Sequence, residues 1–336
     1  MTLLLAGDVG GTKTLLGIYS VEQGQLSLRQ QRRYRSSAWD GLLPMLRDAL
    51  ADQAAVDAAC LAVAGPVRSG EARLTNLGWT LHTAQLRAAL GLARLELVND
   101  FAVLIHGLPH LQAHQWLEVQ EGIANPTGTV AILGAGTGLG MAAGHRQPRG
   151  GWLACPSEGS HGEFAPRTAA EWHMKDWLRR DLQLDRLSTE RIVSGTGLGH
   201  VFRWCIRDGR HHPLEEAAAL WRRDPSRFDL PAAVGEGARQ GDATARRAVE
   251  LWLGAYGSAA GDLALTHLCD GGLWIGGGTA ARQIDGLRSA HFLEALHDKG
   301  RLGGYLRRLP IRLLHDPDAG LFSAACRARD LLDMAG

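Results

Sequence analysis

The hydrophobic pattern of the 336-residue chain contains the same local unit twice: an apolar run, a glycine-rich break and a second apolar run. The first unit covers residues 3–20 and the second covers residues 128–144. Apolar runs of this length predict strands that are buried on both faces. Glycine supplies the positive φ angle of tight turns, so each unit predicts a β-hairpin. The repetition predicts two structurally related domains, although two unrelated hairpins would give the same pattern.

The remaining apolar periodicity predicts an alternation of strands and helices. We expect further strands at residues 26–35, 58–64, 95–98, 273–275 and 311–315, and a short strand followed by a turn at residues 72–79. We expect helices at residues 39–53, 82–90, 168–180, 243–269 and 319–334. Residues 194–199 form a glycine cluster, and residues 207–231, rich in Arg, His and Pro, predict a surface excursion. A meander followed by alternating strands and helices is typical of mixed sheets covered by helices, which predicts an α/β fold.

Length and composition limit the class of protein. The chain is too long for one core of typical size, so we expect two domains. With 45% hydrophobic and 21% charged residues it can bury substantial cores, and a net charge of +1 provides no field that would attract nucleic acid or an anionic membrane. The sequence shows no secretory leader and no apolar stretch long enough to span a bilayer, which predicts a cytoplasmic protein.

Neither the cysteines nor the histidines predict a metal site. The five cysteines are widely spaced without a C-x-x-C pair, so we expect neither a zinc ribbon nor a disulfide framework. His106, His110 and His114 recur at helical spacing, but Pro109 interrupts that helix and no acidic residue accompanies them.

The glycine break of the first unit has the chemistry of a phosphate-binding turn. Bare glycine amides can surround a phosphate, and Asp8 at the end of a buried strand could hold the accompanying Mg²⁺. A P-loop is excluded because Thr12 stands where its second glycine belongs. A Rossmann fingerprint is excluded because strand-type residues, not a helix, follow the glycines. An ordinary hairpin remains the alternative.

Two later glycine segments fit the same chemistry. The break at residues 134–138 lacks the glycine at 139 that a dinucleotide loop would need, so a second phosphate-binding hairpin is the better interpretation. The triplet Gly276–Gly278, between a strand and a helix, would supply a flat backbone surface for an adenosine, although a lone glycine triplet is usually a helix-packing or turn device.

Polar residues with acid–base chemistry lie between these segments. Asn99 and Asp100 follow a strand, where they predict either a helix cap or a general base with a neighbouring amide. Carboxylates with a histidine, as in the turn Ser157–Glu163, suit the hydroxyl groups of a sugar. Glu190 is a further carboxylate in front of the glycine cluster. Taken singly, such residues are more often solvated surface or caps.

The order of these motifs carries a family resemblance. The segments GDVGGT, LVNDF, LGAGTGLG, SEGSHGEFAPR, STERIVSGTGL and GGG run along nearly the whole chain. This set resembles the bacterial ATP-dependent glucokinase family, the group of the actin/hexokinase-type sugar kinase superfamily that is distinct from the zinc-containing ROK kinases. The resemblance implies a two-domain actin/hexokinase-like (ribonuclease H-like) fold with a cleft between the domains. We expect a small α/β domain at residues 1–110 plus 318–336 and a large one at 111–317.

The resemblance also implies roles for single residues. Asp100 is the expected catalytic base, and the expected glucose ligands are Asn99, Glu158, His161 and Glu190. The expected ATP-binding residues are Gly7, Asp8, Gly10, Gly11, Thr12, Gly136, Thr137, Gly138, Gly277 and Gly278, with Asp8 also expected to hold Mg²⁺.

The implied activity is transfer of the γ-phosphoryl group of MgATP to the 6-hydroxyl of glucose, and the implied assembly is a homodimer without a nucleic-acid or membrane partner. Two alternatives stay open at this point. One is a kinase for mannose, fructose or an N-acetyl hexosamine; the other is a non-catalytic sugar-sensing regulator of the same fold. The intact Asp8 and Asp100, and the short segment before Gly7, favour the enzyme over the regulator.

Overall fold

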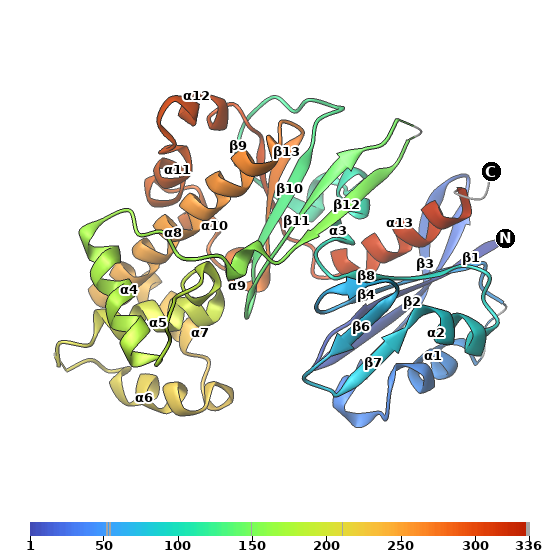
Figure 1. Ribbon diagram of the computed structural model, residues 1–336, viewed down its shortest axis with the longest axis horizontal. Coiled ribbons are helices and arrows are strands. Elements are labelled where there is room, and N and C mark those ends of the chain that lie inside the picture. The colour runs from blue at the N-terminus through green and yellow to red at the C-terminus, as the bar shows by residue number, and fades with distance from the viewer. Residues whose placement is uncertain (52, 54, 149, 210, 334–336) are drawn as a thin grey trace. The chain divides into compact units, whose positions relative to one another are not determined.

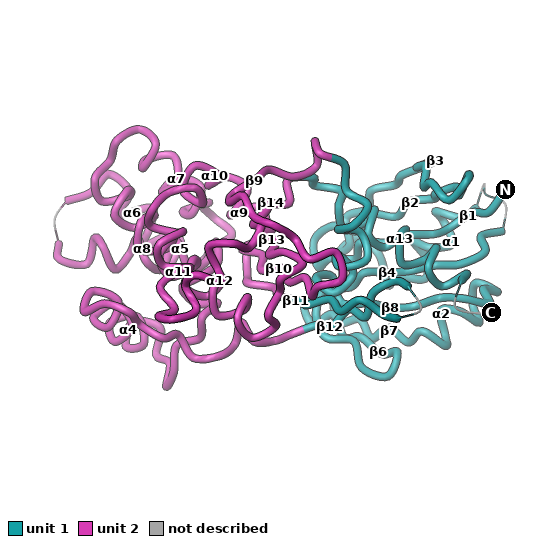
Figure 2. Tube along the Cα trace, turned by 90° about the horizontal axis from the view of Figure 1, so that it is seen from above, with its two compact units in different colours: residues 1–112, 142–156, 316–336 teal, residues 113–141, 157–315 magenta. Residues whose placement is uncertain are grey.

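A computed structural model describes residues 1–51, 53, 55–148, 150–209 and 211–333 of the chain, which form two compact units (Figure 1, Figure 2). Unit 1 comprises Met1–Gln112, Ala142–Pro156 and Asp316–Gly336, and unit 2 comprises Ala113–Met141 and Ser157–His315. The division therefore runs through strands β11 (Leu139–Arg146) and β12 (Trp152–Ser157). The domain bounds expected from the sequence stay a prediction; they differ from these units mainly at 142–156.

Unit 1 is built on a five-stranded sheet with the order β3-β2-β1-β4-β8. Its strands are β1 (Thr2–Val9), β2 (Lys13–Glu22), β3 (Gln25–Arg35), β4 (Ala58–Val63) and β8 (Leu95–Asn99). The first three form an antiparallel meander, whereas β4 pairs parallel to both β1 and β8. A second, three-stranded sheet contains β5 (Val67–Arg68), β6 (Glu71–Leu74) and β7 (Trp79–His82).

Both faces of β1 are covered by helices, which explains its continuous apolar run. Side chains alternate across a strand, so Leu3 and Leu5 pack in the cluster that contains α1 (Leu42–Leu50) and α2 (Thr83–Leu90). Leu4 and Ala6 pack on the opposite face, with α13 (Ala319–Asp333). The short α3 (Leu104–Gly107) packs against α13.

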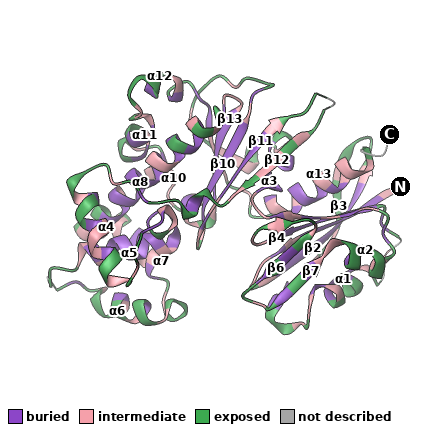
Figure 3. Ribbon diagram, viewed as in Figure 1, coloured by how far each residue is buried: buried purple, intermediate pink, exposed green. Residues whose placement is uncertain are grey.

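Unit 2 is built on a six-stranded sheet with the order β12-β11-β10-β13-β14-β9. Its other strands are β9 (Trp116–Gln120), β10 (Val130–Ala135), β13 (Gly272–Gly276) and β14 (Ile311–Leu314). Strands β10, β13 and β14 run parallel, and every residue of β10 and β13 is buried (Figure 3). The helices are α4 (Ala169–Asp181), α5 (Gly195–Cys205), α6 (Glu215–Arg223), α7 (Leu230–Arg239), α8 (Ala243–His267), α9 (Gly278–Ala281), α10 (Ile284–Leu287), α11 (Ala290–His297) and α12 (Gly303–Leu306).

The α/β architecture expected from the sequence is confirmed, with two local corrections. The glycine cluster at residues 194–199 lies mostly inside helix α5. The stretch 207–231 is not merely a surface excursion, because it contains α6, whose Trp221 is buried. The C-terminal helix extends through Asp333, and its predicted last residue, Met334, lies outside the described residues. None of the described helices is long and apolar enough to cross a membrane.

The packing of α3 on α13 generates a stability prediction. An alanine Cβ at Gly107 would overlap Ser323 Oγ and lie 3.0 Å from Ser323 Cα, so Gly107→Ala should destabilise the protein by ~1–3 kcal/mol through overpacking. Gly304→Ala in α12 is the matched control, because a Cβ there meets nothing within 4 Å. Thermal unfolding measures both; a Gly107→Ala melting temperature equal to that of the control would contradict the packing described here.

Candidate active site

The first glycine turn, Gly10–Thr12, connects β1 to β2 and is held by hydrogen bonds to its backbone. Ser36 Oγ donates to Gly10 O at 2.7 Å, and Ser36 N donates to Thr12 O at 3.0 Å. The Gly10 N–H donates to Lys13 O at 3.0 Å. These bonds occupy carbonyl oxygens of the turn.

The expectation that positive φ angles explain the turn glycines is wrong. Neither Gly10 and Gly11 nor Gly136 and Gly138 of the second turn has a positive φ. At Gly10 the requirement for glycine is steric, because a Cβ there would lie 3.0 Å from Lys13 O. Gly11 faces the Asn76 side chain, with which a Cβ at 11 would make contacts of 3.4–3.5 Å. Asn76 was not predicted as a site residue, because it belongs to none of the sequence motifs and its contact with Gly11 is a tertiary one.

Gly7 and Asp8 belong to strand β1 itself. A Cβ at Gly7 would lie 2.6 Å from Leu61 Cδ2, so packing against β4 already requires a glycine there. Asp8 is half-buried beside the start of α13, where a Cβ at Gly320 would lie 3.3 Å from its Oδ2. Burial raises the pKa of Asp8, the nearby Lys13 opposes this shift, and Asp318 adds to it. The ionised form of Asp8 is therefore disfavoured by its surroundings.

The residues Asn99 and Asp100 lie at the same sheet edge as Asp8. Asp8 pairs with Ala62 of β4 and Ala62 pairs with Val98 of β8, so Asp8 and Asn99 both stand at the carboxyl ends of parallel strands. Strands β1 and β8 are separated by β4 alone, which corresponds to ~10 Å in a sheet. This edge is where α/β sheets commonly hold their ligands.

Both side chains of this pair accept hydrogen bonds from the backbone N–H groups that follow them. Asn99 Oδ1 accepts from the N–H groups of Phe101 and Ala102, both at 3.0 Å, and its Nδ2 donates to Gly65 O at 3.1 Å. Asn99 Nδ2 also donates to Asp100 Oδ1 at 3.0 Å, which orients the carboxylate. Asp100 Oδ1 also accepts from Phe101 N at 3.0 Å, so Asp100 shares the cap with Asn99 while its carboxylate is oriented by the Asn99 amide.

The carboxylate turn of unit 2 is tied to the segment that carries Glu190. Glu158 and His161 lie across the short helix η4 (Gly159–His161), with Oε2 and Nε2 separated by 3.6 Å. The neighbouring η5 (Thr189–Arg191) contains Glu190, and Thr189 N donates to Gly162 O at 2.9 Å. All three predicted sugar ligands of unit 2 therefore lie on two turns that are bonded to each other.

The second glycine turn, Gly136–Gly138, is oriented by the starts of two helices. Gly195 N and Thr279 Oγ1 donate to Gly136 O at 2.7 and 3.2 Å, and Thr196 Oγ1 donates to Thr137 O at 2.9 Å. Sequence reasoning missed these donors. The signal that could have found α5 is Ser194, whose side chain caps the helix by accepting from Gly197 N at 2.8 Å.

A cavity of about 830 Å³ lies in unit 2 against this turn. Gly136, Thr137, Thr196 and Gly278 line one part of it. The other part is lined by residues of the stretch 207–231 and of α7, among them Trp221, Pro225, Ser226, Phe228, Asp229 and Pro231. The stretch 207–231, to which the sequence assigned no role, thus contributes one wall of this cavity.

Within the triplet Gly276–Gly278, the structural need for glycine differs between Gly277 and Gly278. Gly277 has a φ of 89°, and a Cβ there would overlap the backbone of Ala135, so the fold alone demands glycine. A Cβ at Gly278 would meet nothing within 4 Å, because this residue faces the cavity.

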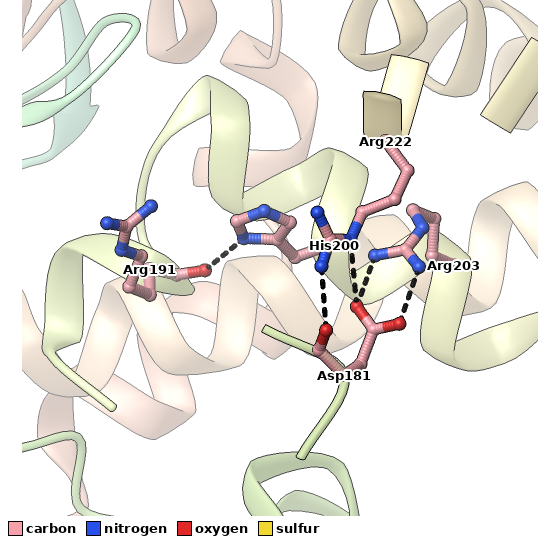
Figure 4. Close-up of polar contacts among 5 residues, drawn as sticks. All are labelled: Asp181, Arg191, His200, Arg203 and Arg222. Atoms are coloured by element: carbon pink, nitrogen blue, oxygen red, sulfur yellow. Dashed lines mark hydrogen bonds and ion pairs between the residues drawn. The ribbon is translucent and has the colours of Figure 1, made fainter. Parts of the chain in front are cut away.

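A polar network fixes the segment that carries Glu190 (Figure 4). The His200 ring of α5 lies with Nδ1 3.1 Å from Arg191 O, and burial lowers the pKa of His200 to about 4. The ring is therefore neutral near pH 7, and its Nδ1–H donates to the carbonyl. On the same helix, Arg203 binds both carboxylate oxygens of Asp181 at 2.6 and 2.8 Å, and Arg222 of α6 donates to Asp181 O at 2.7 Å.

Comparisons with known proteins agree on one family. A model of the family described as Glucokinase matches residues 5–331. A glucokinase from Synechocystis is 37% identical over 97% of this chain and 98% of its own, and one from Chromohalobacter salexigens is 34% identical over 96% of both. Among solved structures, a glucokinase from an Antarctic psychrotroph superposes with a TM-score of 0.81 at 26% identity, covering 98% of this chain and 99% of that one.

The fold extends to more distant proteins. A glucokinase from Balamuthia mandrillaris solved with glucose has a TM-score of 0.76 at 20% identity, over 98% of this chain and 94% of that one, which shows the fold alone. A ROK family glucokinase from Streptomyces griseus has a TM-score of 0.63 at 20% identity, over 98% and 99%. The two α/β units thus have the actin/hexokinase-like fold of the sugar kinases. Within that class, the chain belongs to the glucokinase family.

The raised pKa of Asp8 predicts that this residue costs stability. Because the folded state favours the protonated carboxyl, stability is lost as the pH rises from the ordinary pKa of aspartate through the raised one. Asp8→Asn should therefore melt at a higher temperature than the wild type at pH 7.5, and the difference should shrink toward pH 4. Thermal unfolding at both pH values measures this, and a less stable variant at pH 7.5 would contradict the account.

The lowered pKa of His200 predicts acid sensitivity. Unfolded chains take up the proton below pH 6.5 but the folded protein only near pH 4, so stability falls as the pH is lowered through this window. One such group contributes at most ~1.4 kcal/mol per pH unit. His200→Gln should flatten the pH dependence of the urea-unfolding free energy between pH 6.5 and 4. An unchanged pH dependence would show that His200 is not buried in the neutral form.

Proposed function

We propose that this chain transfers the γ-phosphoryl group of MgATP to the 6-hydroxyl of glucose, giving glucose 6-phosphate and ADP. The observation that carries the proposal is the match to the glucokinase family, which spans residues 5–331 and so includes every candidate site residue. Relatives named glucokinase align over nearly the full length of both chains, which supports the same reaction here.

The cavity of unit 2 supports the nucleotide part of the proposal. Its volume of about 830 Å³ falls in the usual range for small-molecule sites, and the N–H groups of Thr137 and Gly138 suit phosphate oxygens. In this assignment the nucleoside occupies the cavity beside Gly277 and Gly278. In unit 1, the turn Gly10–Thr12, with Gly7 behind it, serves the phosphates as well.

Asp8 suits the Mg²⁺ that accompanies ATP. Mg²⁺ is usually held by one or two carboxylates together with substrate phosphates, and no group of three His, Cys, Asp or Glu side chains in the described part of the chain could hold a metal by itself. A carboxylate whose ionised form is disfavoured by burial gains from a nearby cation, which fits the environment of Asp8. When bound, Mg²⁺ neutralises phosphate charge.

The sugar is assigned to Asn99, Glu158, His161 and Glu190, and the base to Asp100. In the proposed step the glucose O6 attacks the γ-phosphorus, and Asp100 takes the proton of that hydroxyl. The bond from the γ-phosphorus to the bridging oxygen breaks, and ADP leaves with the electron pair. Asn99 Nδ2 holds Asp100 Oδ1, which keeps the base oriented.

We also propose that the protein acts in the cytoplasm as a homodimer, with no nucleic-acid or membrane partner. The family resemblance and the nearly balanced charge support this assignment. Light scattering on the purified chain measures the assembly directly.

A panel of hexoses tests the proposed substrate. Initial rates of ADP release are compared for glucose, mannose, fructose, N-acetylglucosamine and no sugar. Glucose should give the highest kcat/KM, since inverting or blocking a bound hydroxyl leaves its buried partner unpaired. A higher kcat/KM with another hexose would reassign the substrate, and no sugar-dependent ADP release would remove the kinase.

Asp100→Asn tests the base. The amide keeps the size of the side chain and can accept a hydrogen bond but cannot take the proton, so kcat should fall ~10²–10⁴-fold. The loose transition state of phosphoryl transfer favours the lower end of this range. Glucose affinity and melting temperature should change little. A folded variant with near-normal kcat would leave Asp100 as a structural residue of its turn.

A further inference from the structure

The carboxylate of Glu190 lies on the second glycine turn, next to the amide groups assigned to phosphate. Its Oε2 accepts from Leu139 N at 3.0 Å, and a Cβ added to Gly138 would lie 2.6 Å from the same oxygen. Glu190 was predicted as a sugar ligand, and a sugar-binding role alone does not explain its contact with the glycine turn.

Leu139 supplies one of four successive N–H groups in this turn. The Gly136 N–H donates to Gly138 O at 3.0 Å, and the Leu139 N–H donates to Glu190. The N–H groups of Thr137 and Gly138 donate to no acceptor among the residues that the structure describes. The Glu190 carboxylate thus binds the amide of Leu139. The two amides before it in the chain, those of Thr137 and Gly138, are the ones that can bind an anion.

The position of the carboxylate is imposed by its surroundings. Ser194 Oγ donates to Glu190 O at 2.7 Å, and His200 holds the carbonyl of the next residue, Arg191. Gly138 lets the carboxylate approach because it has no side chain. The negative charge of Glu190 is therefore held at the turn by contacts that the chain itself makes.

A phosphate bound at Thr137 and Gly138 would meet this like charge at short range. Successive residues are ~3.8 Å apart, so an anion on the Gly138 amide lies within a few ångströms of the carboxylate. Two unit charges ~5 Å apart repel by ~1–3 kcal/mol at the effective dielectric constants of protein surfaces and water.

We propose that Glu190 makes nucleotide binding depend on the sugar. Without sugar, its charge opposes the phosphates at the turn. When glucose binds, hydroxyl groups donate hydrogen bonds to Glu190 and draw the carboxylate off the Leu139 amide, which leaves the turn to the phosphates. Glu190 is in this role a positioning residue that keeps ATP from binding productively before the sugar arrives. The inference rests on the proposed function, since it needs both ligands.

Glu190→Gln isolates the charge. Its amide oxygen can still accept from Leu139 N, so the shape of the turn is kept. Calorimetric titration with the magnesium complex of the non-hydrolysable ATP analogue AMPPNP, without sugar, should show affinity raised ~5- to 150-fold over the wild type. Uncharged adenosine should bind both proteins equally, because it carries no phosphate.

Glu158→Gln is the matched control. It removes a carboxylate from the same proposed sugar set, but Glu158 pairs with His161 and makes no hydrogen bond to the turn within the described residues. Glu158→Gln should weaken glucose binding and leave the sugar-free affinity for AMPPNP unchanged. Thermal unfolding of both variants confirms that they are folded.

A second measurement uses the wild type alone. Saturating glucose should raise its affinity for magnesium AMPPNP and leave its affinity for adenosine unchanged, and the glucose effect should be smaller in Glu190→Gln. An unchanged or weaker affinity of Glu190→Gln for AMPPNP, or an equal gain for adenosine, would overturn the inference while leaving the proposed function intact. A wild-type protein that binds neither glucose nor AMPPNP would overturn both.

Discussion

The hydrogen bonds that hold the carbonyl oxygens of Gly136 and Thr137 decide how unit 2 presents its glycine turn. A turn has donors and acceptors, and an anion site requires that the donors stay available. Here the start of α5 and Thr279 take the carbonyls, so that the Thr137 and Gly138 amides are left for a ligand. The same contacts bring the start of α5, and with it Glu190, against the turn. The positions of Glu190, of the glycine turn and of the cavity wall beside it all depend on this one junction.

Unit 1 meets a comparable constraint with its sheet. Parallel strands β1 and β8 end at the same edge of the sheet, so the strand pairing alone places Asp8 and Asp100 there. Burial raises the pKa of Asp8 and disfavours its charge, so this edge of the sheet holds a carboxylate that packing alone does not favour. The Asn99 side chain has two roles at this edge: its Oδ1 caps the turn that follows β8, and its Nδ2 orients the Asp100 carboxylate.

The sequence predicted what depends on local pattern. Buried runs such as Leu3–Ala6 identify strands because both faces are covered, and Ala243–His267 has a helical period long enough to be unambiguous. Helix α5 was missed because glycines at 195, 197 and 199 lower helix propensity. Tertiary packing explains them: a Cβ at Gly197 would overlap Ile192, and one at Gly199 would meet the ring of Trp221 at 2.7 Å. No local pattern reports such contacts, nor the wall that 207–231 contributes to the cavity, nor the contact of Glu190 with Leu139. The motif order still located the candidate site residues, although their roles stay predictions.

The central claim is the chemistry of the product. Purified protein incubated with glucose and MgATP is followed by phosphorus NMR, which resolves ADP from the sugar phosphate and identifies the phosphorylated carbon by its coupling to protons. The account predicts glucose 6-phosphate and ADP in equal amounts, and no ADP beyond background when glucose is omitted. Phosphate attached to another carbon, or ADP formed with free phosphate in place of a sugar ester, would contradict it.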